Sequence, residues 1–198
     1  MTLPKWYDGR WPRSAVLAVA IAFGAVVIGA CDDEFSFGPD IRTDTATVYS
    51  LAVPELNLPS AYSFGSLFRG PQILETVEPG IWDLAIDTQN GVLVAVLPAD
   101  FGLITRTRIT TLPNDPVFET VVEAPQDTLV YSAVGPIPLS TSEVYVMRSH
   151  EEQGTFGARC TYFTKFQPTR LDLAAGVVDF ISATNANCND RRLVPENP

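Results

Sequence analysis

His150 is the only histidine of the chain, and its side chain is the only one whose ordinary pKa suits a general base near neutral pH. It lies in the segment 147–152 (Met-Arg-Ser-His-Glu-Glu), directly after an apolar run. A Ser–His–Asp hydrolase would have to use this histidine, but the Gly-x-Ser-x-Gly sequence that presents the serine in many hydrolases does not occur. Because the neighbours of His150 are polar or charged, we expect it to be an exposed loop residue.

Pairs of acidic residues offer a second kind of chemistry. Two carboxylates that face each other across a cleft can hydrolyse a glycoside, and Asp83 with Asp87 or Glu151 with Glu152 are candidate pairs. Asp83, Asp87 and Asn90 also suggest calcium, although their spacing does not match an EF-hand loop. Acidic pairs are common on acidic proteins, so the sequence predicts no catalytic residue, no metal site and no cofactor.

The first of three cysteines, Cys31, follows an apparent export signal. Residues 1–13 contain three bases and one acid, and residues 14–30 form an uncharged apolar run that ends in small residues. The last four residues, Ile28-Gly-Ala-Cys31, resemble the lipobox of bacterial lipoproteins. That resemblance implies removal of residues 1–30 as a signal peptide, attachment of a diacylglycerol to the sulfur of Cys31, and anchoring of the mature chain to a bacterial membrane.

An uncleaved membrane anchor is the alternative interpretation, because the apolar stretch is close to the shortest length that spans a bilayer, roughly 17 residues. Two aspartates, Asp32 and Asp33, follow Cys31. In enteric bacteria an aspartate at that position tends to retain lipoproteins in the inner membrane. The rule does not carry over to all phyla, so the sequence leaves the choice between inner and outer membrane open.

The chain is acidic, with 23 Asp and Glu against 13 Lys and Arg and a formal net charge of −10. Since three of the bases and one of the acids lie in residues 1–30, residues 31–198 carry about −12 and contain one lysine, Lys165. This charge excludes a nucleic-acid-binding function, which requires a basic face. It also argues against electrostatic adhesion to anionic lipid, which leaves the lipid anchor as the expected membrane contact.

Short apolar runs separated by proline and glycine follow an acidic, turn-rich tether at residues 31–44. They predict a mainly β protein with one domain at residues 45–198, folded as an antiparallel sandwich or open barrel, and an N-terminal signal helix in the precursor. A short helix is possible at Pro54–Leu67. The strand candidates are residues 45–51, 81–87, 91–97, 103–110, 118–124, 128–134, 144–149, 160–167 and 177–184.

The segment 81–87 alternates between apolar and other residues and precedes an Asn-Gly turn, the strongest short hairpin signal. Its alternation predicts Trp82, Leu84 and Ile86 on one face. Trp82 could line a ligand site, but a tryptophan that alternates with two aliphatic residues is more often part of the core.

The strand candidates 160–167 and 177–184 predict a C-terminal hairpin centred on Ala174, and in that register Cys160 lies opposite Cys188. Opposed residues in antiparallel strands have Cα atoms about 4.5–5.5 Å apart, which suits a disulfide. The same register gives one apolar face and one polar face. The apolar face holds Cys160, Tyr162, Phe166, Val178, Phe180 and Cys188. The polar face holds Thr161, Lys165, Gln167 and Asp179, with Phe163 and Ile181 as exceptions.

We therefore predict a structural disulfide between Cys160 and Cys188. An even pair of cysteines is typical of proteins in an oxidising compartment. The alternative is a redox or metal pair, which a Cys-x-x-Cys spacing or a neighbouring histidine would favour, and the sequence has neither.

Three phrases in residues 81–184 resemble the HmuY-like lipoproteins: Trp-Asp-Leu-Ala-Ile-Asp at 82–87, Val-Tyr-Val-Met-Arg-Ser at 144–149 and Tyr-Phe-Thr-Lys-Phe at 162–166. The resemblance implies an anchored, β-rich protein, and some members of that family bind haem. The best-known member holds haem through two histidines, whereas this chain has only His150.

Taken together, these features predict a non-enzymatic cell-envelope lipoprotein with a binding or structural role, exported and anchored to a bacterial membrane on its periplasmic or outer-surface face. The first alternative is a carrier of a small hydrophobic or haem-like ligand, which would need a deep pocket with a few polar groups. The second alternative is an envelope hydrolase that uses acidic residues. The partner, whether an envelope protein or a small molecule, is unknown at this point.

Overall fold

The computed structural model describes residues 38–55, 57–67, 69–74, 77, 80–112 and 116–196, with only the backbone of Thr155. The predicted signal peptide (residues 1–30), the lipid-accepting Cys31 and the first part of the predicted tether lie outside the described residues. Residues from Gly38 onward belong to one compact unit, which is mainly β as the sequence predicts.

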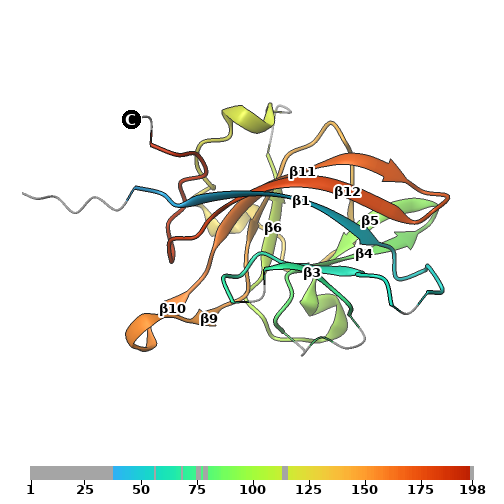
Figure 1. Ribbon diagram of the computed structural model, residues 1–198, viewed down its shortest axis with the longest axis horizontal. Helices are drawn as coiled ribbons and strands as arrows, with labels where there is room; N and C mark the ends of the chain where they lie inside the picture. The colour runs from blue at the N-terminus through green and yellow to red at the C-terminus, as the bar shows by residue number, and fades with distance from the viewer. Residues whose placement is uncertain are drawn as a thin grey trace, which may run out of the picture. The chain divides into compact units, whose positions relative to one another are not determined.

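Two antiparallel five-stranded sheets pack as a sandwich (Figure 1). The first sheet has the spatial order β1 (Ile41–Tyr49), β12 (Val177–Asn185), β11 (Phe163–Asp172), β8 (Tyr145–Arg148) and β6 (Arg108–Thr111). The second has the order β3 (Gly70–Gln72), β2 (Ala61–Ser63), β4 (Leu84–Gln89), β5 (Val92–Val96) and β7 (Ile137–Pro138). A small hairpin of β9 (Glu152–Gln153) and β10 (Arg159–Cys160) protrudes from the sandwich.

Four short 3₁₀ helices lie in the connections between the described strands. They are η1 (Pro98–Phe101), η2 (Phe118–Thr120), η3 (Thr128–Val130) and η4 (Thr155–Gly157). The segments 118–124 and 128–134, which the sequence predicts as strands, contain η2 and η3 instead. Prolines at 116 and 125 bound the first of these segments, and proline supplies no N–H to a strand ladder.

The first strand begins earlier than expected and joins the two sheets. β1 pairs with β12 from Ile41 to Tyr49, so residues 41–44 are strand and the tether assigned to residues 31–44 is too long at its C-terminal end. Beyond Tyr49 the chain reaches the second sheet, where the backbone N–H of Leu51 donates to the carbonyl of Ile86 at 2.8 Å. The possible helix at Pro54–Leu67 is wrong, because residues 61–63 form β2 between β3 and β4.

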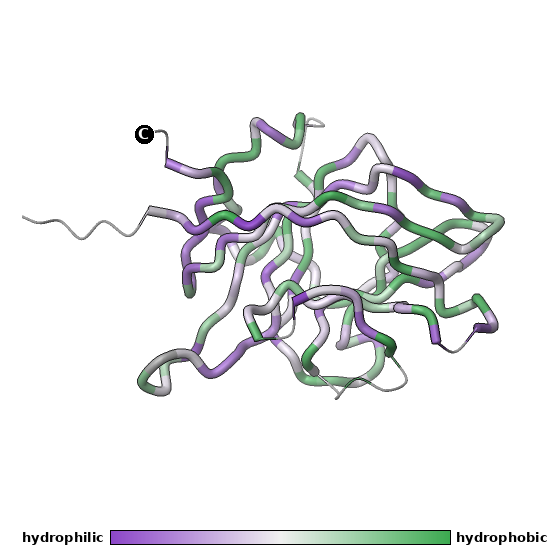
Figure 2. Tube along the Cα trace, viewed as in Figure 1, coloured by the Kyte–Doolittle hydropathy of each residue, from purple (hydrophilic) through white to green (hydrophobic). Residues whose placement is uncertain are grey.

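Aromatic side chains fill the space between the sheets. Phe166 of β11 stacks on Tyr145 of β8 with ring centroids 5.0 Å apart, and it meets Phe180 of β12 edge-on at 5.7 Å. Tyr62 of the second sheet meets Phe180 at 5.0 Å. Such pairs stabilise by about 0.5–1.5 kcal/mol beyond the area they bury. Figure 2 shows hydrophobic and hydrophilic residues interspersed along the strands of the sandwich.

A second, smaller core lies on the outer face of the first sheet. Phe163 and Val146 of that face pack against Val121 and Leu193, which come from the segment after η2 and from the C-terminal segment. Phe163 is an exception to the predicted polar face, and this outer layer is the physical reason for it. Lys165 of the same face is also buried, at 3% exposure, and its Nζ donates to the carbonyls of Phe118 and Val121 at 2.8 and 2.9 Å.

Candidate functional site

His150 lies in the interior of the protein, with 5% of its surface exposed, and the expectation of an exposed loop histidine is wrong. It follows β8 and stands between two carboxylates, Asp83 just before β4 and Glu152 at the start of β9. Its Nδ1 lies 2.9 Å from Oδ1 of Asp83, and its Nε2 lies 3.4 Å from Oε1 of Glu152. The candidate acid pairs Asp83/Asp87 and Glu151/Glu152 are therefore split, since one member of each contacts the histidine.

The two carboxylates accept further hydrogen bonds, from backbone N–H groups and from one hydroxyl. Asp83 is fully buried and accepts hydrogen bonds from the backbone N–H groups of Phe64 and His150, each at 2.6 Å. Glu152 accepts from the backbone N–H and the hydroxyl of Ser66, at 3.2 and 3.0 Å. The cluster thus ties the segment 64–66, which follows β2 of the second sheet, to the segment that follows β8 of the first sheet. Since it links chain segments far apart in sequence, we call the cluster of Asp83, His150, Glu152 and Ser66 the clasp.

The charge state of the clasp follows from these contacts. Burial alone would lower the pKa of His150, but hydrogen bonds and attraction to Asp83 and Glu152 outweigh it and raise the pKa to about 10. Burial works against the ionised form of Glu152 too, yet His150 and Ser66 lower its pKa on balance. We therefore expect a protonated imidazole at neutral pH, with Nδ1 directed at Asp83 and Nε2 at Glu152. Such a group has no free lone pair with which to act as a general base.

Gly65 shows how tightly the clasp is packed. A Cβ atom at this position would overlap Oε1 of Glu152 and crowd the Cε1 of His150. Next to it, the hydroxyl of Tyr162 donates to that of Ser66 at 3.1 Å, which closes the cluster on its other side. The requirement for glycine at 65 therefore comes from close approach of side chains and not from a special backbone conformation.

Asp87, the member of the pair Asp83/Asp87 that does not contact His150, bonds only to its own neighbours in the part of the chain that the structure describes. Asp87 accepts from the backbone N–H of Thr88 and from Nε2 of Gln89, its own neighbours in β4. Within the described residues there is no group of three or more His, Cys, Asp or Glu side chains placed to hold a metal ion. Trp82 is buried as expected, but it belongs to a cluster with Ala85 and Val94 of the second sheet that is separate from the core cluster of Leu84 and Ile86. Its position differs because β4 begins only at Leu84.

Cys160 and Cys188 lie at disulfide distance, with sulfur atoms 1.99 Å and Cα atoms 4.9 Å apart. The predicted register holds from Thr164 opposite Thr184 to Pro168 opposite Phe180, then shifts by one residue at a bulge. Both cysteines lie beyond the end of this ladder, since Cys160 belongs to β10 and Cys188 follows β12. The bond thus fixes the base of the protruding β9–β10 hairpin to the C-terminal segment.

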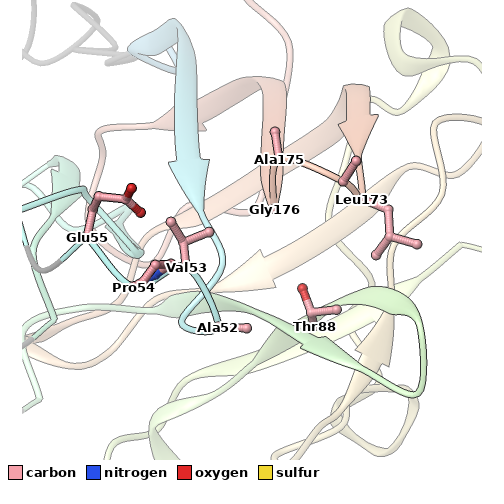
Figure 3. A pocket seen from close by; sticks show the side chains of 9 residues that line it. Ala52, Val53, Pro54, Glu55, Thr88, Leu173, Ala175 and Gly176 are labelled. Carbon is pink, nitrogen blue, oxygen red and sulfur yellow. The ribbon is translucent and has the colours of Figure 1, made fainter.

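A shallow pocket of about 350 Å³ lies at the end of the sandwich where β11 turns into β12 (Figure 3). Its wall combines Val53 and Pro54, Thr88 of β4 and the turn residues Leu173 and Gly176. Glu55 is its one charged residue. A ligand site usually needs a few polar groups that converge, and this pocket does not supply them.

A larger cleft of about 470 Å³ lies over the outer face of the first sheet. Its floor is a row across three neighbouring strands, because Arg108 of β6 lies directly opposite Arg148 of β8, which lies opposite Phe163 of β11. Tyr131, just after η3, and Arg191 of the C-terminal segment form its walls. This arginine cleft was not anticipated from the sequence, and it gathers three of the ten bases that follow residue 30.

The arginines of the cleft are poorly neutralised by the protein itself. Arg148 has its closest carboxylate at 3.9 Å, on Glu151, which also pairs with Arg106 and Arg159. Among the described residues, no ion pair involves Arg108, which donates to its neighbouring backbone carbonyl, that of Thr107. Of the three arginines of the cleft, only Arg191 has a described carboxylate within 3 Å, which is that of Glu123 at 2.6 Å. The cleft therefore presents positive charge on an otherwise acidic protein.

No known protein family, no curated protein and no solved structure matches this chain. Within the described part of the chain, no helix has the length and apolar character needed to cross a membrane.

Proposed function

We propose that this protein is an exported lipoprotein, anchored to a bacterial membrane through lipid on Cys31, with a non-enzymatic binding role in the cell envelope. One observation carries the proposal. A basic start, an uncharged apolar run and the sequence Ile28-Gly-Ala-Cys31 follow one another in the order that export and lipidation require. A single acyl chain holds a protein only marginally, so anchoring would rest on several chains attached at this residue.

The disulfide supports export independently of the leader. Bonds of this kind persist in oxidising compartments and are rare in the cytosol, and the two cysteines other than Cys31 lie at bonding distance. A structural pair leaves Cys31 as the one cysteine free to accept lipid. Export to an oxidising compartment, a disulfide between Cys160 and Cys188, and a lipid anchor on Cys31 are therefore consistent with one another.

A binding role is favoured over hydrolysis by the state of the acidic and histidine side chains. His150 is held between two carboxylates inside the fold, and this arrangement suits a structural role better than proton transfer with a substrate. The arginine cleft, in contrast, is open to solvent and large enough for a small molecule, since ligand sites span about 300–1,000 Å³. We therefore assign binding to the cleft and a structural role to the clasp.

A carrier of small ligands is the second candidate, and the arginine cleft favours ligands that carry an anionic group. Histidine is the haem ligand that the HmuY-like resemblance implies, and both ring nitrogens of the chain's one histidine, His150, face carboxylates. A carrier role would thus concern polar, anionic molecules.

Metabolic labelling with a palmitate analogue tests the anchor. We expect label on the wild-type protein and none on Cys31→Ala, because only Cys31 lies in a lipobox. The Cys188→Ser variant is the matched control and should keep the label, since that cysteine is assigned to the disulfide. An unlabelled wild-type protein, or equal label on Cys31→Ala, would refute lipid anchoring.

A further inference from the structure

We propose that the arginine cleft binds the carboxylate or phosphate group of a small organic molecule. This inference rests on the proposed binding role but not on the lipid anchor. It assigns Arg108 and Arg148 as the groups that hold the anion, with Arg191 at the side and Phe163 and Tyr131 as an apolar surface for the rest of the ligand.

The register of the first sheet is the first argument. Arg108 and Arg148 are direct partners in the β6–β8 ladder, so their side chains leave the same face of the sheet side by side. Like charges directly opposed on neighbouring strands destabilise a sheet. An anion bound between the two guanidinium groups would attract both and so offset this repulsion. The register therefore favours binding of an anion at this position.

The unsatisfied donors are the second argument. The Nε of Arg148 is buried and has no hydrogen-bond partner among the described residues, although most buried donors in proteins are paired. The side chain as a whole is 28% exposed and lines the cleft. Arg108 likewise directs only one described hydrogen bond to the protein, at 2.8 Å to its neighbour's carbonyl. Several N–H donors of the two forks thus remain for a ligand.

The chemistry of guanidinium groups selects the ligand class. Their planar forks match the oxygen geometry of carboxylate and phosphate, and such charge-assisted pairs are among the strongest hydrogen bonds in proteins. Tyr131 contributes a neutral ring, as any tyrosine does at neutral pH, and burial raises the pKa of its hydroxyl further, to about 12, despite the opposing effect of Arg191 and Arg148. Its hydroxyl donates to the carbonyl of Pro125 at 3.1 Å and is therefore already engaged with the protein.

Thermal-shift and calorimetric titrations of the mature, detergent-solubilised protein test the proposal with three probes. These are inorganic phosphate, benzoate, and benzamide as the neutral analogue of benzoate, all at matched ionic strength. We expect benzoate or phosphate to bind and to raise the melting temperature, and benzamide to have no effect. Comparison of the benzoate and phosphate titrations then identifies which oxyanion the cleft prefers.

Arg148→Gln and Arg108→Gln should each weaken binding about tenfold or more, as expected for loss of a hydrogen bond to a charged group. The matched control is Arg170→Gln, since Arg170 pairs with Asp172 and Asp179 on the β11–β12 hairpin and does not line the cleft. Circular dichroism verifies that each variant is folded. Absence of binding by both anions, equal binding of benzamide, or unchanged affinity in both cleft variants would overturn the assignment.

These outcomes are separate from those of the labelling experiment. A protein that carries lipid on Cys31 but binds neither anion remains an anchored lipoprotein without this ligand. A protein that binds the anion but carries no lipid keeps the cleft and loses the anchor.

Discussion

Oδ1 of Asp83 contacts His150 twice, through the backbone N–H at 2.6 Å and through Nδ1 of the ring at 2.9 Å. The two residues are separated by 67 positions, and they join the start of β4 to the end of β8. This pair, together with Glu152, forms a buried polar cluster between the two sheets.

The clasp makes stability depend on pH in both directions. Because the pKa of His150 is raised from 6.5 to about 10, its contribution is complete below pH 6.5 and is lost as the pH rises towards 10. Because the pKa of Glu152 is lowered from 4.5, its contribution is complete above pH 4.5 and is lost as the pH falls. Scanning calorimetry should therefore find the highest melting temperature between these limits.

The His150→Gln variant identifies the source of the alkaline loss. Glutamine does not titrate, so the variant should be less stable at pH 6 but should lose less stability than the wild type between pH 6.5 and 10. An equally steep alkaline decline in both proteins would assign the effect to other groups.

Substitution of Asp83 should be among the most damaging changes in the chain. Asp83→Asn leaves the buried, protonated His150 without its main counter-charge, and removing one partner of a buried pair costs about 3–5 kcal/mol. Asp87→Asn is the matched control in the same segment and should cost less than about 1 kcal/mol, since Asp87 is only half buried. Urea denaturation measures both, and similar losses for the two variants would contradict the role assigned to Asp83.

Gly65→Ala tests the packing of the clasp without changing its charges. The added methyl group overlaps Glu152, and overpacking of this kind costs about 1–3 kcal/mol. Gly38→Ala is the control, because a Cβ there meets Glu196 only at an ordinary contact distance of 3.4 Å. Urea denaturation measures both variants. If both are as stable as the wild type, the side chains of the clasp do not pack tightly against Gly65.

The disulfide should contribute to stability mainly through the unfolded chain. Closing a loop of 28 residues stabilises by about 3–4 kcal/mol in the loop-entropy model. Cys188→Ser should therefore lower the free energy of unfolding by roughly that amount. A titration of thiols under denaturing, non-reducing conditions gives an independent measure. Free thiols at Cys160 and Cys188 in that titration would show that the bond does not form.

Lys165 should resist modification while the protein is folded. Burial lowers the pKa of its ammonium group, although Glu119 opposes the shift, and its Nζ is held by two backbone carbonyls and lies 4.7 Å from the ring centre of Phe118. An amine-reactive ester should therefore label Lys165 after denaturation and leave it largely unlabelled before. Rapid labelling of the folded protein would mean that the outer layer does not cover this face.

The parts of the fold that the sequence predicts correctly are those with local patterns. Alternation in segments such as 177–184 and the Asn-Gly turn at 90–91 identify strands and a hairpin, and β4 and β5 pair across that turn. The spacing of Cys160 and Cys188 gives the register of β11 and β12 up to the bulge. In each case the interacting residues are close in sequence or share one turn, so their geometry follows from chain connectivity.

The parts that the sequence does not reveal depend on distant segments. The polar neighbours of His150 suggest exposure, and its burial becomes evident only when Asp83 is brought to it from the other sheet. The arginine cleft likewise needs β6 to pair with β8, and nothing within the strand of Arg108 or of Arg148 specifies that partner. The burial of Lys165 depends on the layer of η2, which the sequence predicts as a strand.

Intact-mass spectrometry of the protein purified from membranes examines export, anchor and disulfide in one experiment. We expect a chain that begins at Cys31, carries a diacylglycerol and usually a further acyl chain, and is two hydrogens lighter than the fully reduced form. A chain that retains residues 1–30, has no acyl mass and contains only reduced cysteines would contradict the proposed export, anchor and disulfide together.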